Sequence, residues 1–285
     1  MNFDNKAWLT LYDNSFKTDD YIYHYTSMEK AVLILYGDSL KFSKINSTND
    51  TLEAKPKMSY QEIIATEQRR KVFKQIQEIN NNYIQLLCFS KDNSNIDNSI
   101  VLDDPSTDTK LNDYSGRGFA LPRMWAQYSN NNNGVCFIFN KKLIEKQIKK
   151  QLNHSLIKSG DVEYVSQYKK LDMDYDSLEE LLVDNVIQKS INYVDYLKNN
   201  LAFTNYNYFY KLNDWKNENE YRCIAYGNNE FYVHNIKSAI IGVIIGEQIE
   251  PSDEKILKYF VGDLCEIKKI SFSYNGCLLT NIYND

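Results

Sequence analysis

The stretch YIYHYTSMEKAVLILYGDSLKFS, residues 21–43, contains the pattern that decides the fold. Residues 21–27 are rich in aromatic and β-branched side chains and predict a strand. Residues 28–36, MEKAVLILY, predict a helix, and residues 39–45, SLKFSKI, predict a second strand. Such a succession favours a sheet with helices packed against it. His24 lies inside the first strand, and a lone histidine among aromatic residues is either a hydrogen-bonded core residue or a functional group.

Both ends of this predicted helix carry recognisable boundary residues. Thr26 or Ser27 can act as the N-cap, and Glu29 falls in the first turn, where a carboxylate is favoured. Gly37 follows the last apolar residues and can adopt the left-handed conformation that ends many helices. We therefore expect the helix to start next to Ser27 and to stop at Gly37.

The rest of the chain alternates between predicted helices and strands. Strands are expected at residues 83–90, 134–139, 220–226, 230–235, 236–246 and 265–274. Helices are expected at 59–78, from Pro122, and across 141–201, where the strand-like segment 161–168 interrupts the helical pattern. Residues 91–118 are polar and predict a long surface loop. Strands near both ends of the chain predict an α+β fold with a mixed or antiparallel sheet core. We expect one domain, residues 1–285, in which 20–140 and 205–285 form the sheet and 141–204 is a mostly helical insertion.

The composition describes a globular chain without membrane, secretion or metal signals. Its 285 residues are 43% hydrophobic and carry a net charge of -5, which argues against a generally basic nucleic-acid-binding surface. There is no long apolar run and no cationic, apolar leader, so we expect a cytoplasmic protein that does not enter membranes. The five cysteines are widely spaced and do not form a zinc-type or disulfide pattern, so no metal is expected.

The most informative late motif is WKNENEYRCI, residues 215–224. Glu218 and Glu220 lie two residues apart at the predicted start of a strand, so they should point to the same side of it. Two carboxylates on one side repel each other, and burial would then raise at least one pKa. Arg222 continues on that side and could pair with either acid. The alternative interpretation is a solvent-facing, charged strand edge.

Five motifs in a fixed order resemble a bacterial family of unknown function, domain-of-unknown-function family 2971. They are HYTS, LKFSKINSTNDTLE, LLCFS, MWAQYSNNNNGVCFIFN and WKNENEYRC, and they span about residues 21 to 246. A more distant similarity is to the ADP-ribosyltransferase superfamily, whose members often carry His or Arg on a first strand and a later catalytic Glu, sometimes as E-x-E. His24 and the pair Glu218 and Glu220 match these positions in order.

This second resemblance implies an enzyme that transfers ADP-ribose from NAD to a macromolecule, in the manner of a bacterial toxin or phage-defence effector. It implies Glu220, Glu218 and His24 as catalytic residues, with Glu220 stabilising the positive charge that develops on the ribose. It implies the following NAD-binding residues: His24, Tyr25, Thr26, Ser43, Ser90, Arg123, Tyr128 and Arg222. Among these, Ser43, Ser90 and Tyr128 compete for the superfamily's middle motif. The implied partners are NAD, a nucleic-acid or protein acceptor, and an inhibitory protein.

Two functions from other classes stay open at the level of sequence. A non-catalytic nucleotide- or nucleic-acid-sensing module could bind phosphate through His24, Arg123 and Arg222. A metal-dependent nuclease could gather Asp50, Glu53 and later acids around Mg²⁺.

Overall fold

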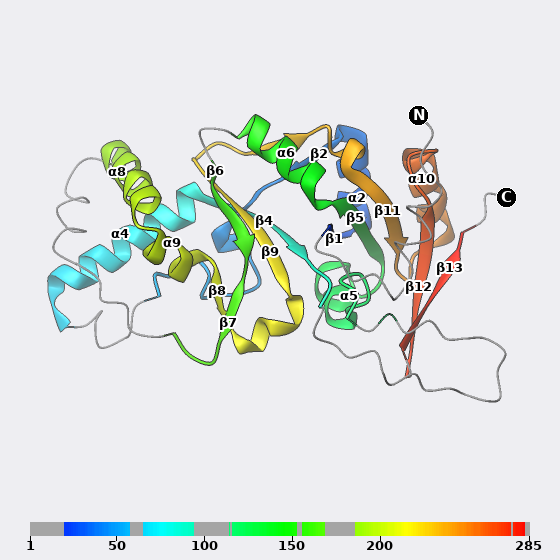
Figure 1. Cartoon of the computed structure of the whole chain (residues 1–285), viewed down its shortest axis with the longest axis horizontal. Helices are drawn as coiled ribbons and strands as arrows, with labels where there is room; N and C mark the ends of the chain where they lie inside the picture. Colours follow the sequence, from blue (N-terminus) through cyan, green and yellow to red (C-terminus); the bar gives the residue numbers. More distant parts are fainter. Residues whose placement is uncertain are drawn as a thin grey trace.

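The computed structural model describes residues 20–57, 65–93, 114, 116–152, 156–168, 186–274 and 276–282. The predicted α+β class is confirmed over this part of the chain, where helices pack on both faces of one mostly antiparallel sheet (Figure 1). Within it, no helix combines the length and the apolar character needed to cross a membrane.

The main sheet has the strand order β13-β12-β11-β5-β1-β4-β9-β6, with the short β3 added to β4. Its strands are β1 (Tyr21–Ser27), β3 (Ser43–Lys44), β4 (Ile84–Ser90), β5 (Gly134–Asn140), β6 (Leu156–Asp161), β9 (Glu220–Tyr226), β11 (Ile240–Ile245), β12 (Ile267–Ser273) and β13 (Gly276–Asn281). Neighbouring strands are antiparallel except β11 and β12. Two small strand pairs lie outside it. β2 (Ser39–Lys41) pairs with β10 (Tyr232–His234) in antiparallel orientation, and β7 (Glu163–Val165) pairs with β8 (Tyr210–Leu212) in parallel orientation.

Strand β1 joins two parts of this sheet. Along its whole length it pairs with β5, from Tyr21 opposite Asn140 to Ser27 opposite Gly134. Its register with β4, by contrast, contains the single pair Tyr23 and Ser90. One part of the sheet consists of β13, β12, β11, β5 and β1, and the other of β4, β9 and β6. The two parts therefore meet at one short junction.

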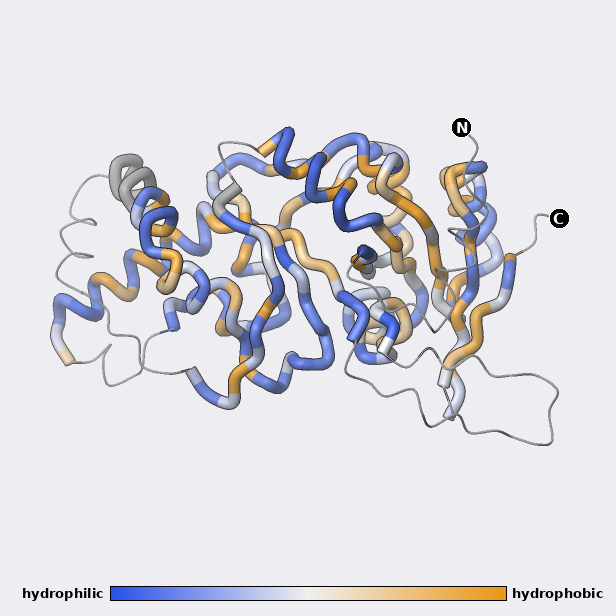
Figure 2. Tube along the Cα trace, viewed as in Figure 1, coloured by the Kyte–Doolittle hydropathy of each residue, from blue (hydrophilic) through white to orange (hydrophobic). Residues whose placement is uncertain are grey.

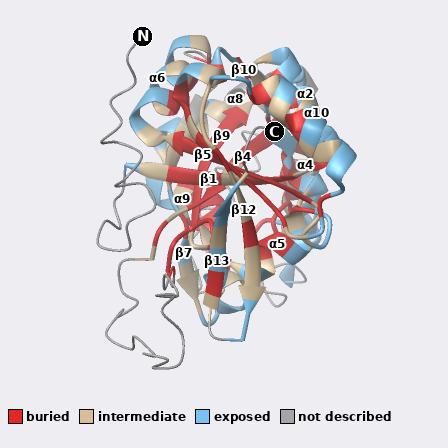
Figure 3. Cartoon of the chain, turned by 90° about the vertical axis from the view of Figure 1, so that its right-hand side faces the viewer, coloured by how far each residue is buried: buried red, intermediate tan, exposed pale blue. Residues whose placement is uncertain are grey.

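Each face of the sheet is covered by its own helices, and the core lies in the two layers between them. We call the face that carries the side chains of Ile22 and Leu87 the back face, and the opposite one the front face. The back face packs against α2 (Met28–Gly37), α6 (Lys141–Gln151) and, beside α2, α10 (Pro251–Val261). The front face packs against α5 (Pro122–Tyr128) on the β1 side and against α4 (Glu67–Tyr83), α8 (Val186–Asn199) and α9 (Leu201–Tyr208) on the β9 side. Apolar residues run along the central strands, and exposed residues gather on the outer helices (Figures 2 and 3).

The structure corrects four details of the predicted elements. The left-handed residue at the end of α2 is Asp38, with φ 45°, and Gly37 remains helical. Asp tolerates this conformation better than most residues, and here its carboxylate accepts a hydrogen bond from the backbone N–H of Lys237. The predicted strand 39–45 divides into β2 and β3, which pair with different partners. The predicted helix 59–78 is observed as α4, while residues 58–64 lie outside the described residues.

Two further corrections concern the middle of the chain and its C-terminal part. Within residues 141–204, the predicted strand-like segment 161–168 contains β7, but β6 begins earlier than predicted and pairs with β9 at the edge of the main sheet. The helix α10 and the strand β13 were not predicted. Three 3-10 helices complete the described elements: η1 (Ile45–Ser47), η2 (Asn213–Glu218) and η3 (Ile236–Ala239).

Candidate functional site

A group of buried charged side chains lies on the front face, at the end of the sheet where β9 begins. We call it the charged cluster, and its members are Glu53, Lys211, Glu218, Glu220 and Arg222. They come from the turn after η1, from β8, from the last residue of η2 and from β9. No member has a side chain more than 6% exposed. Burying five charges is costly unless each is paired, so the pairing decides what this cluster can do.

Arg222 is the centre of the cluster and uses its guanidinium fork on two acids. Its Nε and Nη2 donate to the two carboxylate oxygens of Glu220, both at 2.7 Å. Its Nη1 donates to Glu53 Oε2 at 3.0 Å and to the carbonyl oxygen of Tyr208 at 2.8 Å. Burial acts to lower the pKa of Arg222, but Glu220 and Glu53 raise it well above its usual value. Arg222 is therefore a permanent, fully engaged cation.

Lys211 links the two glutamates of the E-x-E motif. Its Nζ lies 2.7 Å from Glu218 Oε2 and 3.2 Å from Glu220 Oε2. The remaining oxygen of Glu218, Oε1, accepts a 2.7 Å hydrogen bond from the hydroxyl of Tyr128 on α5. Burial, and then the charge of Glu218, raise the pKa of that hydroxyl. The cluster thus holds three carboxylates and two cations.

The two glutamates do not share a strand, so the sequence prediction of their geometry is wrong. Glu218 ends η2, Asn219 adopts the left-handed conformation with φ 43° and ψ 57°, and Glu220 is the first residue of β9. The rise in pKa that was expected for at least one of the two carboxylates does not occur at Glu220. Burial acts to raise its pKa, but Arg222 and Lys211 lower it below the usual range. Glu220 is therefore ionised at neutral pH.

Ser90 lies next to Glu220 across the strands. In the registers of β4 it stands opposite Glu220 on one side and opposite Tyr23 on the other. Residues that are paired in register project to the same face, so Ser90 points toward the front. Its Oγ is buried and has no hydrogen-bond partner among the described residues. Ser43, the other serine considered for the middle motif, is exposed and pairs with Leu86, nearer the opposite end of β4.

His24 and Thr26 project from the other face of the sheet. They alternate with Tyr23, which shares the front face with Ser90, so their side chains point to the back. His24 Nδ1 lies 3.1 Å from the carbonyl oxygen of Cys88, and its ring contacts Phe89 edge-on at 5.7 Å. Burial lowers the pKa of His24, so the imidazole is neutral at neutral pH. The structure does not bring His24 or Thr26 together with Glu220.

Tyr25 and Arg123 lie on the front side but outside the charged cluster. The Tyr25 hydroxyl donates to the carbonyl oxygen of Gly118 at 2.7 Å, and its ring contacts Trp125 edge-on. Arg123 Nη1 donates to the carbonyl oxygen of Asp214 at 2.5 Å, and its guanidinium lies over Trp215. The ammonium of Lys211 lies 4.9 Å from the centre of the same ring. Arg123 is half-buried, so it is the predicted phosphate-binding arginine that solvent can reach.

The comparisons with known proteins support the family resemblance over part of the chain. Residues 124–223, which run from α5 into β9, match the model of a family described as "Protein of unknown function (DUF2971)". That range covers 100 of the 285 residues and includes every member of the charged cluster except Glu53. No curated protein matches the chain, and no solved structure matches it. The similarity to the ADP-ribosyltransferase superfamily therefore remains a hypothesis from the motifs.

Sequence reasoning missed Lys211 and Lys57, and it named Glu53 only as a possible metal ligand. Lys57 is buried beside the charged cluster, and its ammonium donates to the carbonyl oxygen of Asn207. Burial lowers its pKa to about 8. A usable signal for Lys211 was its isolation in the aromatic run YNYFYKL, because a lysine that is buried there needs acidic partners.

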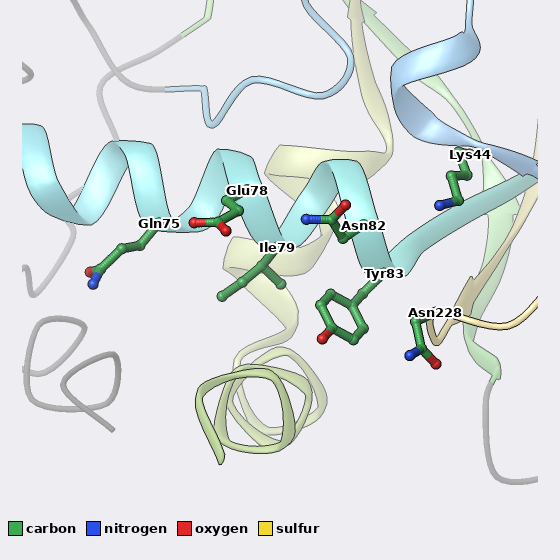
Figure 4. A pocket seen from close by; sticks show the side chains of 7 residues that line it. All are labelled: Lys44, Gln75, Glu78, Ile79, Asn82, Tyr83 and Asn228. Atoms are coloured by element: carbon green, nitrogen blue, oxygen red, sulfur yellow. The ribbon is translucent and has the colours of Figure 1, made fainter. Parts of the chain in front are cut away.

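The described part of the chain offers no metal site, and a hollow in it lies apart from the charged cluster. That part of the chain holds no group of three or more His, Cys, Asp or Glu residues placed to bind a metal ion. A hollow of about 250 Å³ is lined by Lys44, Gln75, Glu78, Ile79, Asn82, Tyr83 and Asn228 (Figure 4). It lies at the opposite end of β4 and β9 from Ser90 and Glu220, and no residue of the charged cluster lines it. The chemistry-bearing residues and this hollow are therefore separate features.

Proposed function

We propose that this protein is an ADP-ribosyltransferase-like enzyme that uses NAD to modify a macromolecule, with Glu218 and Glu220 at its centre. The observation that carries the proposal is the position of Ser90 directly opposite Glu220. The resemblance orders its motifs as His, then an aromatic residue or serine, then Glu. His24, Ser90 and Glu220 fall on three neighbouring strands, β1, β4 and β9, in that same order. Ser90 is therefore our candidate for the middle motif.

The electrostatics of the charged cluster suit this reaction. Breaking the glycosidic bond of NAD makes an oxocarbenium-like ribose, whose positive charge develops only in the transition state. An ionised carboxylate that is held in place before the reaction stabilises that charge without reorganising. Arg222 and Lys211 keep Glu220 ionised and fix its position. In this proposal the two cations hold the carboxylate in place, and the carboxylate acts on the ribose.

The proposed transfer breaks one bond of NAD and forms one new bond to the ribose. The bond between ribose C1′ and the nicotinamide nitrogen breaks, and neutral nicotinamide leaves with the electron pair of that bond. A nucleophile of the acceptor, or water, forms the new bond to C1′ and loses one proton. Glu218 is our candidate for the base, because the Tyr128 hydroxyl that contacts it lies at the partly exposed edge of the cluster. Arg123 is our candidate for the pyrophosphate, because Arg222 has its donors engaged.

His24 receives a different role in this proposal from the one that the resemblance implies. Its side chain lies on the back face, and its bond to the Cys88 carbonyl crosses the junction where β1 and β4 share a single register pair. We therefore assign His24 to holding this junction. An asparagine can offer a hydrogen-bonding nitrogen near the position of Nδ1, so His24→Asn should keep more function than His24→Ala.

Nicotinamide release from NAD, with and without bacterial lysate, tests the proposal, and mass spectrometry then identifies any modified acceptor. We expect Glu220→Gln to lower the release rate by about 100-fold or more while far-UV circular dichroism is unchanged. The matched control is Glu230→Gln, an exposed glutamate paired with Lys41, which should leave the rate unchanged. The proposal would be overturned if the unmodified protein showed no NAD binding by calorimetry and no nicotinamide release.

The two other functions have less support from the geometry. A phosphate sensor built on His24 and Arg222 would need both side chains free, but they lie on opposite faces and Arg222 is fully engaged. A nuclease built on Asp50 and Glu53 would need further acids around its metal ion, but the described part of the chain holds no group of three or more His, Cys, Asp or Glu residues placed to bind one. Glu53 accepts from Arg222, and Asp50 accepts from the backbone N–H of Leu52 in its own turn. Tight nucleotide binding without any product would nevertheless favour the sensor.

A further inference from the structure

Asn219, the residue between the two glutamates, has an unusual backbone and a specific set of contacts. Its φ of 43° and ψ of 57° lie in the left-handed region, which disfavours side chains other than Gly, Asn and Asp. This conformation turns the chain from η2 into β9. An extended residue here would place Glu218 and Glu220 on one strand, whereas the left-handed turn lets both carboxylates reach Lys211 from different directions.

The side chain of Asn219 fastens this turn to the end of β4. Its amide nitrogen donates to the carbonyl oxygens of Lys91 at 3.1 Å and of Asp92 at 2.9 Å. The backbone carbonyl oxygen of Asn219 accepts from the backbone N–H of Lys91 at 2.9 Å. Asparagine therefore supplies two properties at once: it tolerates the left-handed backbone, and its amide donates to two carbonyl groups.

The segment that receives Asn219 is itself held firmly. The Asp92 carboxylate accepts from the backbone N–H of Gly118 at 2.7 Å and lies 3.1 Å from the Arg117 guanidinium. The backbone N–H of Asn93 donates to the carbonyl oxygen of Gly116 at 2.6 Å. Gly118 has no room for a larger residue, because an added Cβ would lie 2.2 Å from the Tyr23 ring. The turn is thus anchored to a rigid part of the fold.

We propose that Asn219 is the positioning residue of this site, which sets where the Glu218 and Glu220 carboxylates stand relative to Lys211. The catalytic consequence rests on the proposed function, whereas the geometric consequence does not. If two reacting groups are displaced by about 1 Å, an enzyme can lose roughly 100-fold in rate. A residue that only stabilised the fold would change the amount of folded protein, but not the rate of each folded molecule.

Three substitutions separate the two properties of Asn219. Asn219→Gly keeps the left-handed backbone and removes the amide. Asn219→Ala removes the amide and disfavours the backbone. Asn219→Asp tolerates the backbone but turns a carboxylate toward two carbonyl oxygens. We expect kcat for nicotinamide release to fall about 10- to 100-fold in the Ala and Asp variants and less in the Gly variant, with KM for NAD within about twofold.

The matched control is Asn235→Ala. Asn235 is also left-handed, with φ 60°, but it is exposed, lies at the start of η3 and makes no side-chain cap hydrogen bond. This variant should lose Tm as Asn219→Ala does, because the backbone strain is of the same kind, and should keep the full kcat. Equal kcat values in folded Asn219→Ala and in the unmodified protein would overturn the positioning role.

A double-mutant cycle tests the geometric role of Asn219 through Tm, without an activity measurement. If Asn219 holds the carboxylates at Lys211, the fall in Tm caused by Lys211→Met must be smaller in the Asn219→Ala background than in the unmodified background. Additive changes in Tm would overturn the proposal. Glu218→Gln can replace Lys211→Met if the latter does not fold. If the unmodified protein does not act on NAD, the proposed function fails, and this cycle still decides the role of Asn219.

Discussion

Arg117 and Arg222 are both almost completely buried on the front face, but the fold neutralises them in different ways. Arg222 donates to two carboxylates and a carbonyl group. Among the residues that the structure describes, Arg117 lies 3.1 Å from the carboxylate of Asp92, donates to the Tyr23 hydroxyl at 3.3 Å and places its guanidinium over the Phe119 ring. It belongs to what we call the aromatic cluster, formed by Tyr23, Tyr25, Tyr114, Phe119 and Trp125.

The comparison shows how one face of a sheet can bury charge by two strategies. The charged cluster and the aromatic cluster meet at the row Tyr23, Ser90 and Glu220, which crosses β1, β4 and β9. In the charged cluster each ion depends on ions of opposite sign, so the removal of one leaves others unpaired. In the aromatic cluster the cation depends more on packing and on neutral groups. We therefore expect the charged cluster to be the less tolerant of substitution.

The largest expected effect is that of Arg222→Met. The substitution leaves the buried carboxylates of Glu53 and Glu220 without their guanidinium partner, and the loss of one partner of a buried ion pair costs about 3–5 kcal/mol. Urea unfolding should show this loss as a lower midpoint with an unchanged slope. Arg117→Met is the matched variant. Among the described residues it leaves the Asp92 carboxylate, which still accepts from the Gly118 N–H, and it should cost less. Equal costs for the two variants would contradict the comparison.

A second, smaller effect is a pH dependence that originates beside the charged cluster. Burial lowers the pKa of Lys57 from 10.5 to about 8 in the folded protein. Between these values the unfolded chain binds more protons than the folded one, so the free energy of unfolding rises with pH across that window. Below about pH 8 the full penalty, about 3 kcal/mol, is present. At higher pH, unfolded tyrosines ionise first and oppose this rise.

The difference between the unmodified protein and Lys57→Met isolates this effect, because both share the same tyrosines. In urea unfolding at pH 7.5, 8.5 and 9.5, the unmodified protein should gain stability relative to Lys57→Met as the pH rises. A constant difference across this range would show that Lys57 is not strained by burial.

Local patterns were sufficient to predict the central elements of the fold, but not the site. Residues 84–90, 134–140 and 220–226 alternate or cluster apolar side chains strongly enough to identify β4, β5 and β9. The α10 helix was not predicted, although Pro251 marks its first turn. The left-handed turn at Asn219 was missed because an E-x-E spacing says nothing of backbone handedness, and the motif was read as a continuous strand.

The partners of the glutamates could not be predicted, since they come from distant parts of the chain. Arg222 is bound by Glu53, 169 positions earlier, and Glu218 is bound by Tyr128, 90 positions earlier. Only the pairing of Arg222 with Glu220, two residues apart on one strand, was accessible to period-two reasoning, and the structure confirms it. The face of His24 follows from the register between β1 and β4, which the sequence does not specify.

The smallest expected effect lies at the boundary of the two clusters and compares two hydroxyl groups of one row. The Tyr23 hydroxyl accepts from Arg117, so Tyr23→Phe should cost about 1–2 kcal/mol in urea unfolding. The Ser90 hydroxyl is buried and has no partner in the part of the chain that the structure describes, so Ser90→Ala should be neutral or stabilising by up to about 1 kcal/mol. If Ser90 faces NAD, the same variant should lower nicotinamide release. A stability gain with a loss of activity would mark Ser90 as a binding group, whereas equal costs for the two variants would mean that the Ser90 hydroxyl is engaged within the fold.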